Sequence, residues 1–92
     1  MTTTEHHRLE IEFCVQCKFQ GRAFFLAREL YDQRPDLIDE ITLVPATDGS
    51  FSVRYDGSTI FDYHAEHRFP DPKEVRESML ALRGMAPTPP RH

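Results

Sequence analysis

The sequence predicts an α/β domain of two layers, in which a four-stranded mixed sheet carries both of its helices on one face. Stretches of period two and of period 3.6 follow one another along the 92 residues in the order β-α-β-β-β-α. The first strand, the helix and the second strand form a crossover unit. A helical crossover returns the chain in its original direction, so these two strands are parallel and the unit is right-handed. Polar residues alternate through the first and third strands, so one sheet face is polar and both helices are expected on the other.

The first half of the chain supplies a strand, a helix and a second strand. Residues 8–13 alternate between charged and apolar side chains, which is typical of a half-buried strand. The helix follows, where apolar residues recur at helical spacing: Phe19, Ala23, Leu26 and Leu30, with Ala27 and Tyr31 beside them. Pro35 ends this helix near Arg34, since the residue before a proline disfavours the helical conformation. Residues 41–44 form the second strand, which is short and apolar.

The third and fourth strands, residues 51–55 and 58–63, form a hairpin. Asp56-Gly57 lies between them and is a strong turn signal, because a type I′ turn needs positive φ at both central residues. A two-residue turn pairs Val53 with Ile60 and turns Phe61 towards the polar face. An exposed aromatic ring there would mark a self-association patch, so a homo-oligomer is one expectation.

The last helix begins with a recognisable cap. Asp71 suits the N-cap, Pro72 the first helical position, and Glu74 completes the spacing of a capping box. Its apolar stripe is predicted at Val75, Met79 and Leu82, and Gly84 is expected to end the helix. The domain is therefore expected over residues 8–84, between a disordered lead, 1–7, and a disordered proline-rich tail, 85–92.

Composition argues against two classes of partner. The net charge is -4 and the chain has no run of lysines and arginines, which disfavours nucleic acid. No apolar run approaches the roughly 18 residues that cross a bilayer, and the polar first residues do not resemble a signal peptide. The expected location is therefore the cytoplasm, where thiols are kept reduced.

The two cysteines, in Cys14-Val-Gln-Cys17, are the leading candidates for chemistry. They are expected where the first strand ends and the first helix begins, with Cys14 near the N-cap. Unpaired N–H groups and the helix dipole at that point favour thiolate over thiol. We expect the third strand to pair with the first, which makes the loop Pro45–Ser50 cross beside Cys14. A meander in sequence order would keep the loop away.

Two other interpretations of the cysteines stay open. His64 and His67 form a second pair, and CxxC with HxxH could supply four zinc ligands. The protein would then be a non-catalytic interaction module, whose cysteines hold zinc or regulate docking. Alternatively, both cysteines are small buried residues without chemistry. A strand–CxxC–helix arrangement in a cytosolic chain favours the redox interpretation, in which Cys14 and Cys17 form a reversible thiol–disulfide pair.

The chain also resembles a known family. The segments Ile11–Phe19, Arg22-Ala23 and Leu26–Leu30 look like the opening of the SelT/SelW/SelH, selenoprotein W-like family. The similarity extends over about residues 8 to 83 through short matches: Val44-Pro45, Thr47, Gly49–Phe51, Val53, Asp56-Gly57, Ile60–Asp62 and Phe69-Pro70. It implies a thioredoxin-like fold, a redox role at Cys14 and Cys17, and a possible link to glutathione or to a protein thiol partner. It implies no other cofactor.

The roles of the two thiols are predicted from the helix. Family members with selenocysteine carry it at the position of Cys17. The helix N-terminus, however, favours Cys14 as the attacking thiol, because Cys14 is expected nearest the unpaired N–H groups and solvent. Cys17 is expected one turn into the helix, where it is more enclosed. It is therefore predicted to be the resolving thiol, which breaks the mixed disulfide formed at Cys14.

Overall fold

The computed structural model describes residues 6–85, and its architecture is the predicted one. Four strands, two long helices and two short helical turns follow one another in this order: β1 (Arg8–Cys14), α1 (Gln20–Gln33), the 3₁₀ turn η1 (Pro35–Leu37), β2 (Glu40–Ala46), β3 (Phe51–Tyr55), β4 (Ser58–Asp62), α2 (Tyr63–Glu66) and α3 (Pro72–Leu82). The short helix α2 was not predicted. It lies where the sequence indicated a loop through His64 and His67.

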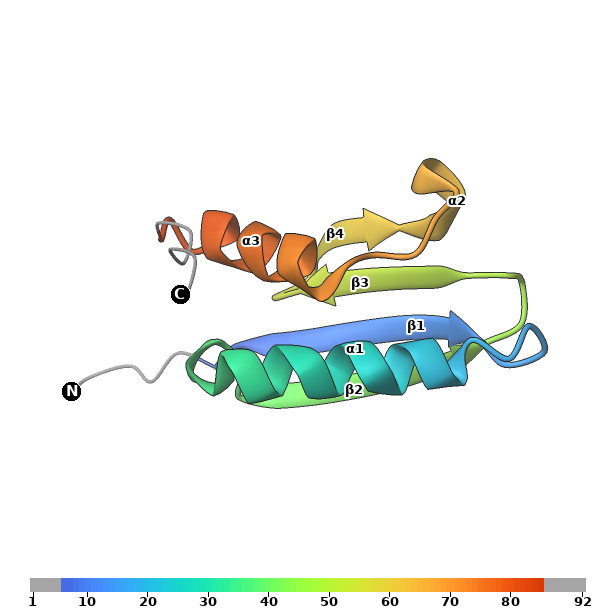
Figure 1. Ribbon diagram of the computed structural model, residues 1–92, viewed down its shortest axis with the longest axis horizontal. Helices are drawn as coiled ribbons and strands as arrows, with labels where there is room; N and C mark the ends of the chain where they lie inside the picture. Colours follow the sequence, from blue (N-terminus) through green and yellow to red (C-terminus); the bar gives the residue numbers. More distant parts are fainter. Residues whose placement is uncertain (1–5, 86–92) are drawn as a thin grey trace.

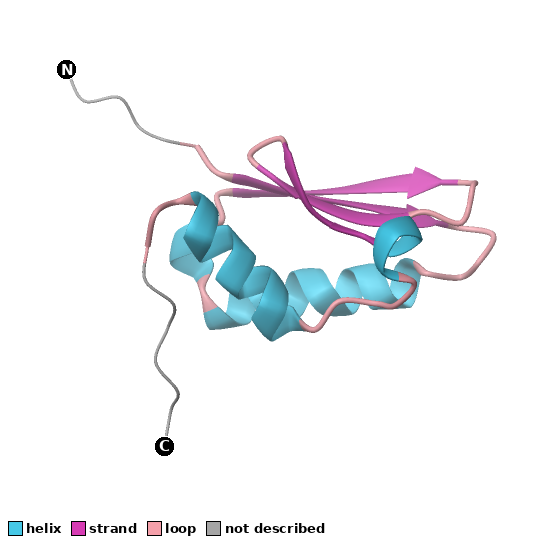
Figure 2. Ribbon diagram, turned by 90° about the horizontal axis from the view of Figure 1, so that it is seen from above, coloured by secondary structure: helices cyan, strands magenta, loops and turns pink. Residues whose placement is uncertain are grey.

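The sheet has the order β2-β1-β3-β4, so β1 is central (Figure 1). β1 is parallel to β2 and antiparallel to β3. Figure 2 shows the long helices on one side of the sheet, as predicted. The other face of the sheet is polar: Arg54 on β3 contacts Glu10 at 2.5 Å and Glu12 at 3.0 Å, both on β1.

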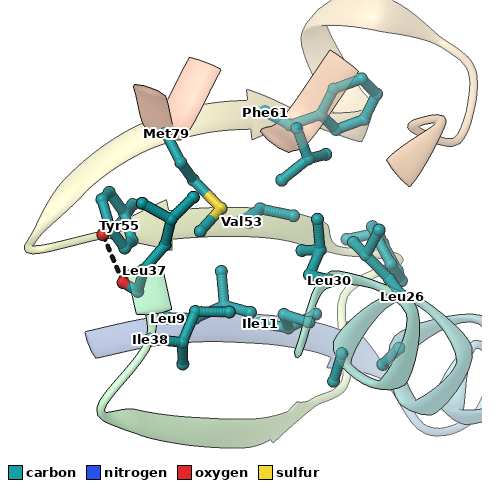
Figure 3. Close-up of a cluster of buried hydrophobic side chains, with 14 of the residues drawn as sticks. Leu9, Ile11, Leu26, Leu30, Leu37, Ile38, Val53, Tyr55, Phe61 and Met79 are labelled. Carbon is teal, nitrogen blue, oxygen red and sulfur yellow. Dashed lines mark hydrogen bonds between the residues drawn. The ribbon is translucent and has the colours of Figure 1, made fainter. Parts of the chain in front are cut away.

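The core lies between the sheet and the helices. Figure 3 shows its middle, where side chains of β1 and β3 meet those of α1, η1 and α3. Tyr55 is fully buried there, and its hydroxyl donates a hydrogen bond of 2.5 Å to the Leu37 carbonyl. This bond satisfies a polar group inside the apolar layer, which is why a tyrosine is tolerated at this depth.

The predicted hairpin register is correct only next to its turn. Asp56 and Gly57 have the positive φ of a type I′ turn, and Tyr55 pairs with Ser58 as expected. A bulge then shifts the register, so Val53 pairs with Phe61 rather than with Ile60. The extra residue rotates Phe61 into the core, where it is 6% exposed. The predicted self-association patch at Phe61 is therefore wrong.

Helix α3 begins as predicted and packs differently at its end. Asp71 and Glu74 form the reciprocal capping box, and Glu74 also binds Arg68 at 2.6 Å. Leu80 is buried, whereas Leu82, which the sequence placed in the stripe, is half exposed.

Two residues of the predicted N-terminal lead, His6 and His7, contact the domain. The backbone N–H of His7 donates to Asp39, and its ring lies 2.6 Å from the Asp56 carboxylate. His6 contacts Glu40. Most of the predicted tails, residues 1–5 and 86–92, lies outside the described residues.

Candidate functional site

The first cysteine is the last residue of the central strand. The N–H of Cys14 donates to the Ser50 carbonyl at 2.8 Å, and the next residue, Val15, donates to the Ala46 carbonyl at 2.9 Å. These bonds place the ends of β2 and β3 on either side of β1, and they bury Cys14 to 1% exposure. The predicted position of the loop Pro45–Ser50, across the end of β1 and beside Cys14, is confirmed.

The second cysteine lies in a turn before helix α1. Residues Val15 to Lys18 are exposed, and the Lys18 N–H closes the turn on the Val15 carbonyl at 2.9 Å. Lys18 has a φ of 61°, which a right-handed helix does not allow, so α1 begins only at Gln20, with Phe19 as its N-cap. Cys17 is therefore outside the helix and exposed.

This geometry reverses the predicted environments of the two thiols. The sequence placed Cys14 near the N-cap and solvent, and Cys17 inside the helix and enclosed. In the structure Cys14 is held in the sheet and buried, because β1 continues one residue beyond its alternating pattern. The turn at Lys18 keeps Cys17 in solvent.

The structure brings the two cysteines together. Cys14 and Cys17 are paired as a disulfide, with their Cα atoms 5.3 Å apart. The N–H of Cys17 also points at the Cys14 sulfur, at 3.2 Å. The pairing needs only the local turn, since residues three apart meet across it. The site therefore combines one buried cysteine with one exposed cysteine.

An aromatic cluster packs at the same end of the sheet. The rings of Phe19, Phe51 and Phe69 meet edge to face, with centroids 4.9 to 6.4 Å apart, and Tyr63 closes the cluster against Phe19. The Arg22 guanidinium lies 4.0 Å above the Phe69 ring. The cluster fixes Phe19, the residue at which the cysteine turn becomes helix. Sequence reasoning missed it, although Phe69-Pro70 was among the matched segments.

The loop beside Cys14 carries a small polar network. The Ser50 hydroxyl donates a hydrogen bond to the Asp48 carboxylate. This bond holds the pKa of Asp48 below its usual range, and the nearby charge of His64 lowers it by a smaller amount. A Cβ atom added at Gly49 would lie 3.9 Å from Cε1 of the His64 ring. The chain thus returns His64 to the loop next to Cys14, whereas the sequence offered no reason for this. His67 ends α2 with a φ of 57°.

A four-ligand zinc site is not assembled within the part of the chain that the structure describes. Among residues 6–85, no three or more histidine, cysteine, aspartate or glutamate side chains come close enough to hold a metal ion.

The fold and this site define a class of protein. A two-layer sandwich with a CxxC pair between its central strand and its first helix is a thioredoxin-like CxxC domain. The comparisons with known proteins make the assignment specific. The chain belongs to the Rdx family, whose model matches residues 8–80.

Two solved structures are similar to this chain over most of its length. One is a protein from Bordetella parapertussis, 29% identical with a TM-score of 0.80, covering 85% of this chain and 99% of that one. The other is a selenoprotein W-related protein from Vibrio cholerae, 28% identical with a TM-score of 0.80, covering 85% of this chain and 98% of that one. A search of curated proteins returned no match. Among the described residues, no helix is long and apolar enough to span a membrane.

Proposed function

We propose that this protein is a thiol–disulfide redox protein, in which Cys17 attacks the partner and Cys14 resolves the mixed disulfide. The observation that carries the proposal is the pairing of an exposed sulfur with a buried one across a single turn. Exposure lets Cys17 meet the disulfide of another molecule. Burial restricts Cys14 to attack within the protein. Membership of the Rdx family supports a redox role for this site.

The reaction is an exchange of two electrons. The Cys17 thiolate attacks one sulfur of a substrate disulfide, whose S–S bond breaks, and the other substrate sulfur leaves as a thiolate. The Cys14 thiolate then attacks the Cys17 sulfur, and the second substrate sulfur leaves. The substrate disulfide is reduced to two thiols, and Cys14 and Cys17 are oxidised to their disulfide. The reverse sequence would oxidise a dithiol.

The backbone around Cys14 suits a resolving thiol. The Cys17 N–H is directed at the Cys14 sulfur at 3.2 Å, and a donor at this position stabilises negative charge on that sulfur. The bonds to Ser50 and Ala46 hold the strand end in place, so the two sulfur atoms need little movement to meet. A preorganised pair gives the internal step the advantage of proximity.

Glutathione or a protein dithiol is the proposed source of electrons. Two glutathione thiols reduce the disulfide of the oxidised protein in two exchanges and leave as glutathione disulfide. The attack falls on the Cys17 sulfur, because it is the accessible one. The reaction is proposed for the cytoplasm, where glutathione is reduced.

Trapping the mixed disulfide tests the proposal. The Cys14→Ser variant, mixed with glutathione disulfide, should accumulate a stable adduct with one glutathione on Cys17. The Cys17→Ser variant is the matched control and should gain little. The intact protein should instead form its internal disulfide, seen by mass spectrometry as the loss of two hydrogens. Equal adducts on both variants would reject the division of roles, and no reaction of the intact protein would reject the redox function.

A further inference from the structure

Strand β2 is an edge strand whose outer backbone groups have no strand beside them within residues 6–85. The Glu40 N–H bonds the His7 carbonyl on the β1 side, and the Ala46 carbonyl bonds the Val15 N–H on that same side. Backbone groups of a strand alternate in direction from residue to residue. The N–H and C=O groups of Ile41 and Leu43, and the C=O of Pro45, are therefore directed away from the sheet.

The side chains along this edge are apolar. Ile41, Leu43 and Pro45 pair with Leu9, Ile11 and Phe13 and share the helix-covered face of the sheet with them. On α1, positions follow one another by about 100° around the axis. Gln33 contacts α3 through Arg76, so Phe24 and Tyr31, which lie on the opposite flank, face the β2 side. Figure 1 shows α1 over β1 and β2, whereas α3 lies on the β3 and β4 side of the sheet.

These five residues form one surface, which we call the β2-edge face: Phe24, Tyr31, Ile41, Leu43 and Pro45. Phe24 is 59% exposed, Tyr31 48% and Ile41 38%. Natural edge strands are usually protected by charges, and the outward-bonding positions of β2 carry none. Pro45 alone limits pairing there, because it lacks an N–H.

We infer that the β2-edge face binds the same face of a second copy of this chain, through antiparallel pairing of the two β2 strands about a two-fold axis. The sheets then join into one of eight strands, with both α1 helices on the same side. Such a contact is isologous, since one surface meets itself.

The backbone groups of the edge match those of a second copy. With Leu43 facing Leu43 of the second copy, each Leu43 N–H meets the opposite Leu43 carbonyl. Each Ile41 N–H meets the carbonyl of the opposite Pro45. All outward N–H groups of Ile41 and Leu43 are then bonded. Pro45 has no N–H to donate to the opposite Ile41 carbonyl, so only that carbonyl is left unpaired, and an unpaired carbonyl costs less than an unpaired N–H.

The contact is at the small end of specific interfaces. Phe24 and Tyr31 are each about half exposed, so covering them removes about 100 Å² apiece from water in each copy. With the strand edge, the interface lies near the lower bound of about 1,000 Å² for a specific contact.

Sedimentation equilibrium tests the inference on the 92-residue protein, with a reductant present so that no disulfide links two copies. We expect the average mass to rise towards twice that of the monomer between about 1 and 500 µM, the range in which such an interface titrates. Phe24→Ser should weaken dimerisation about tenfold or more, since an aromatic anchor is lost. Ile41→Lys should do the same, because a charge at an edge blocks strand pairing.

Phe25→Ser is the matched control. Phe25 is on the same helix, adjacent in sequence and 56% exposed, but it lies about 100° around the axis from Phe24, away from β2. Its variant should dimerise as the parent does. All variants should keep the parent's thermal transition and circular dichroism, which separates lost contact from lost fold.

A monomer at every concentration would overturn the inference, and so would an equal loss in the Phe25→Ser variant. If the parent is monomeric and Phe24→Ser slows exchange with a protein disulfide but not with glutathione disulfide, the edge serves a polypeptide substrate instead, and the inference is again wrong. The masses measured by sedimentation do not depend on cysteine chemistry. The proposed redox function can therefore fail or hold independently of the dimer.

Discussion

The contrast between the two thiols leads to a quantitative prediction for alkylation. In the Cys17→Ser variant the remaining thiol is Cys14, whose side chain is 1% exposed. In the Cys14→Ser variant it is Cys17, which is exposed. Iodoacetamide must reach the sulfur atom, so Cys14 reacts only after the strand end opens.

The cost of that opening follows from the bonds that hold the strand end. The Cys14 N–H to Ser50 bond and the Val15 N–H to Ala46 bond must both break. At about 1 kcal/mol net for each hydrogen bond, opening costs about 2 kcal/mol. Since 1.4 kcal/mol is a factor of ten, Cys14 should react about 30-fold more slowly than Cys17 once both are fully ionised.

The assay is the rate of iodoacetamide addition against pH, followed by mass spectrometry. The plateau rates at high pH compare access alone, because both thiols are then thiolates. Both variants should react equally in concentrated urea, which removes the structural difference. A plateau for Cys14 equal to or above that of Cys17 would refute the assignment of Cys17 as the attacking thiol.

Three further predictions concern the disulfide and the fold. Glutathione buffers should interconvert the reduced protein and its Cys14–Cys17 disulfide with little change in circular dichroism, because the pairing is local; a large change would contradict this. Glu74→Gln should cost about 1 kcal/mol at pH 7 in urea unfolding, through the lost ion pair with Arg68 and the lost negative charge at the N-terminus of α3. The hydrogen bond from Arg68 lowers the pKa of Glu74 to about 2, so the stabilisation is complete above the ordinary value near 4.5. The difference from the parent should therefore shrink as the pH falls from 4.5 towards 2, and a difference independent of pH would exclude this origin. Phe61→Ala should cost about 3 kcal/mol or more in the same measurement, whereas a change below about 0.5 kcal/mol would place Phe61 at the surface.

The order of elements could be predicted from the sequence because each depends on local chemistry. Alternation sets the strands, helical spacing sets α1, and the capping box at Asp71 sets the start of α3. The turn at Asp56-Gly57 needs positive φ, which its residues permit. The parallel pairing of β1 with β2 followed from the helical crossover that connects them.

The errors arose where tertiary contacts override these local signals. The register of β4 changes at a bulge, because rotating Phe61 inward buries a ring that a regular hairpin would expose. The sequence marks neither the bulge nor its place. Leu80 rather than Leu82 is buried at the end of α3 for the same reason, since the packing of the core selects the face.

The sequence by itself determined that two cysteines lie between the central strand and the first helix, at spacing that lets their sulfur atoms meet. Only the tertiary structure decided which one is enclosed. Ser50 and Ala46, distant in sequence, bond the end of β1 and bury Cys14, and the left-handed turn at Lys18 holds Cys17 outside the helix. Burial is set by what folds against a residue, and that information lies in the partners rather than in the motif.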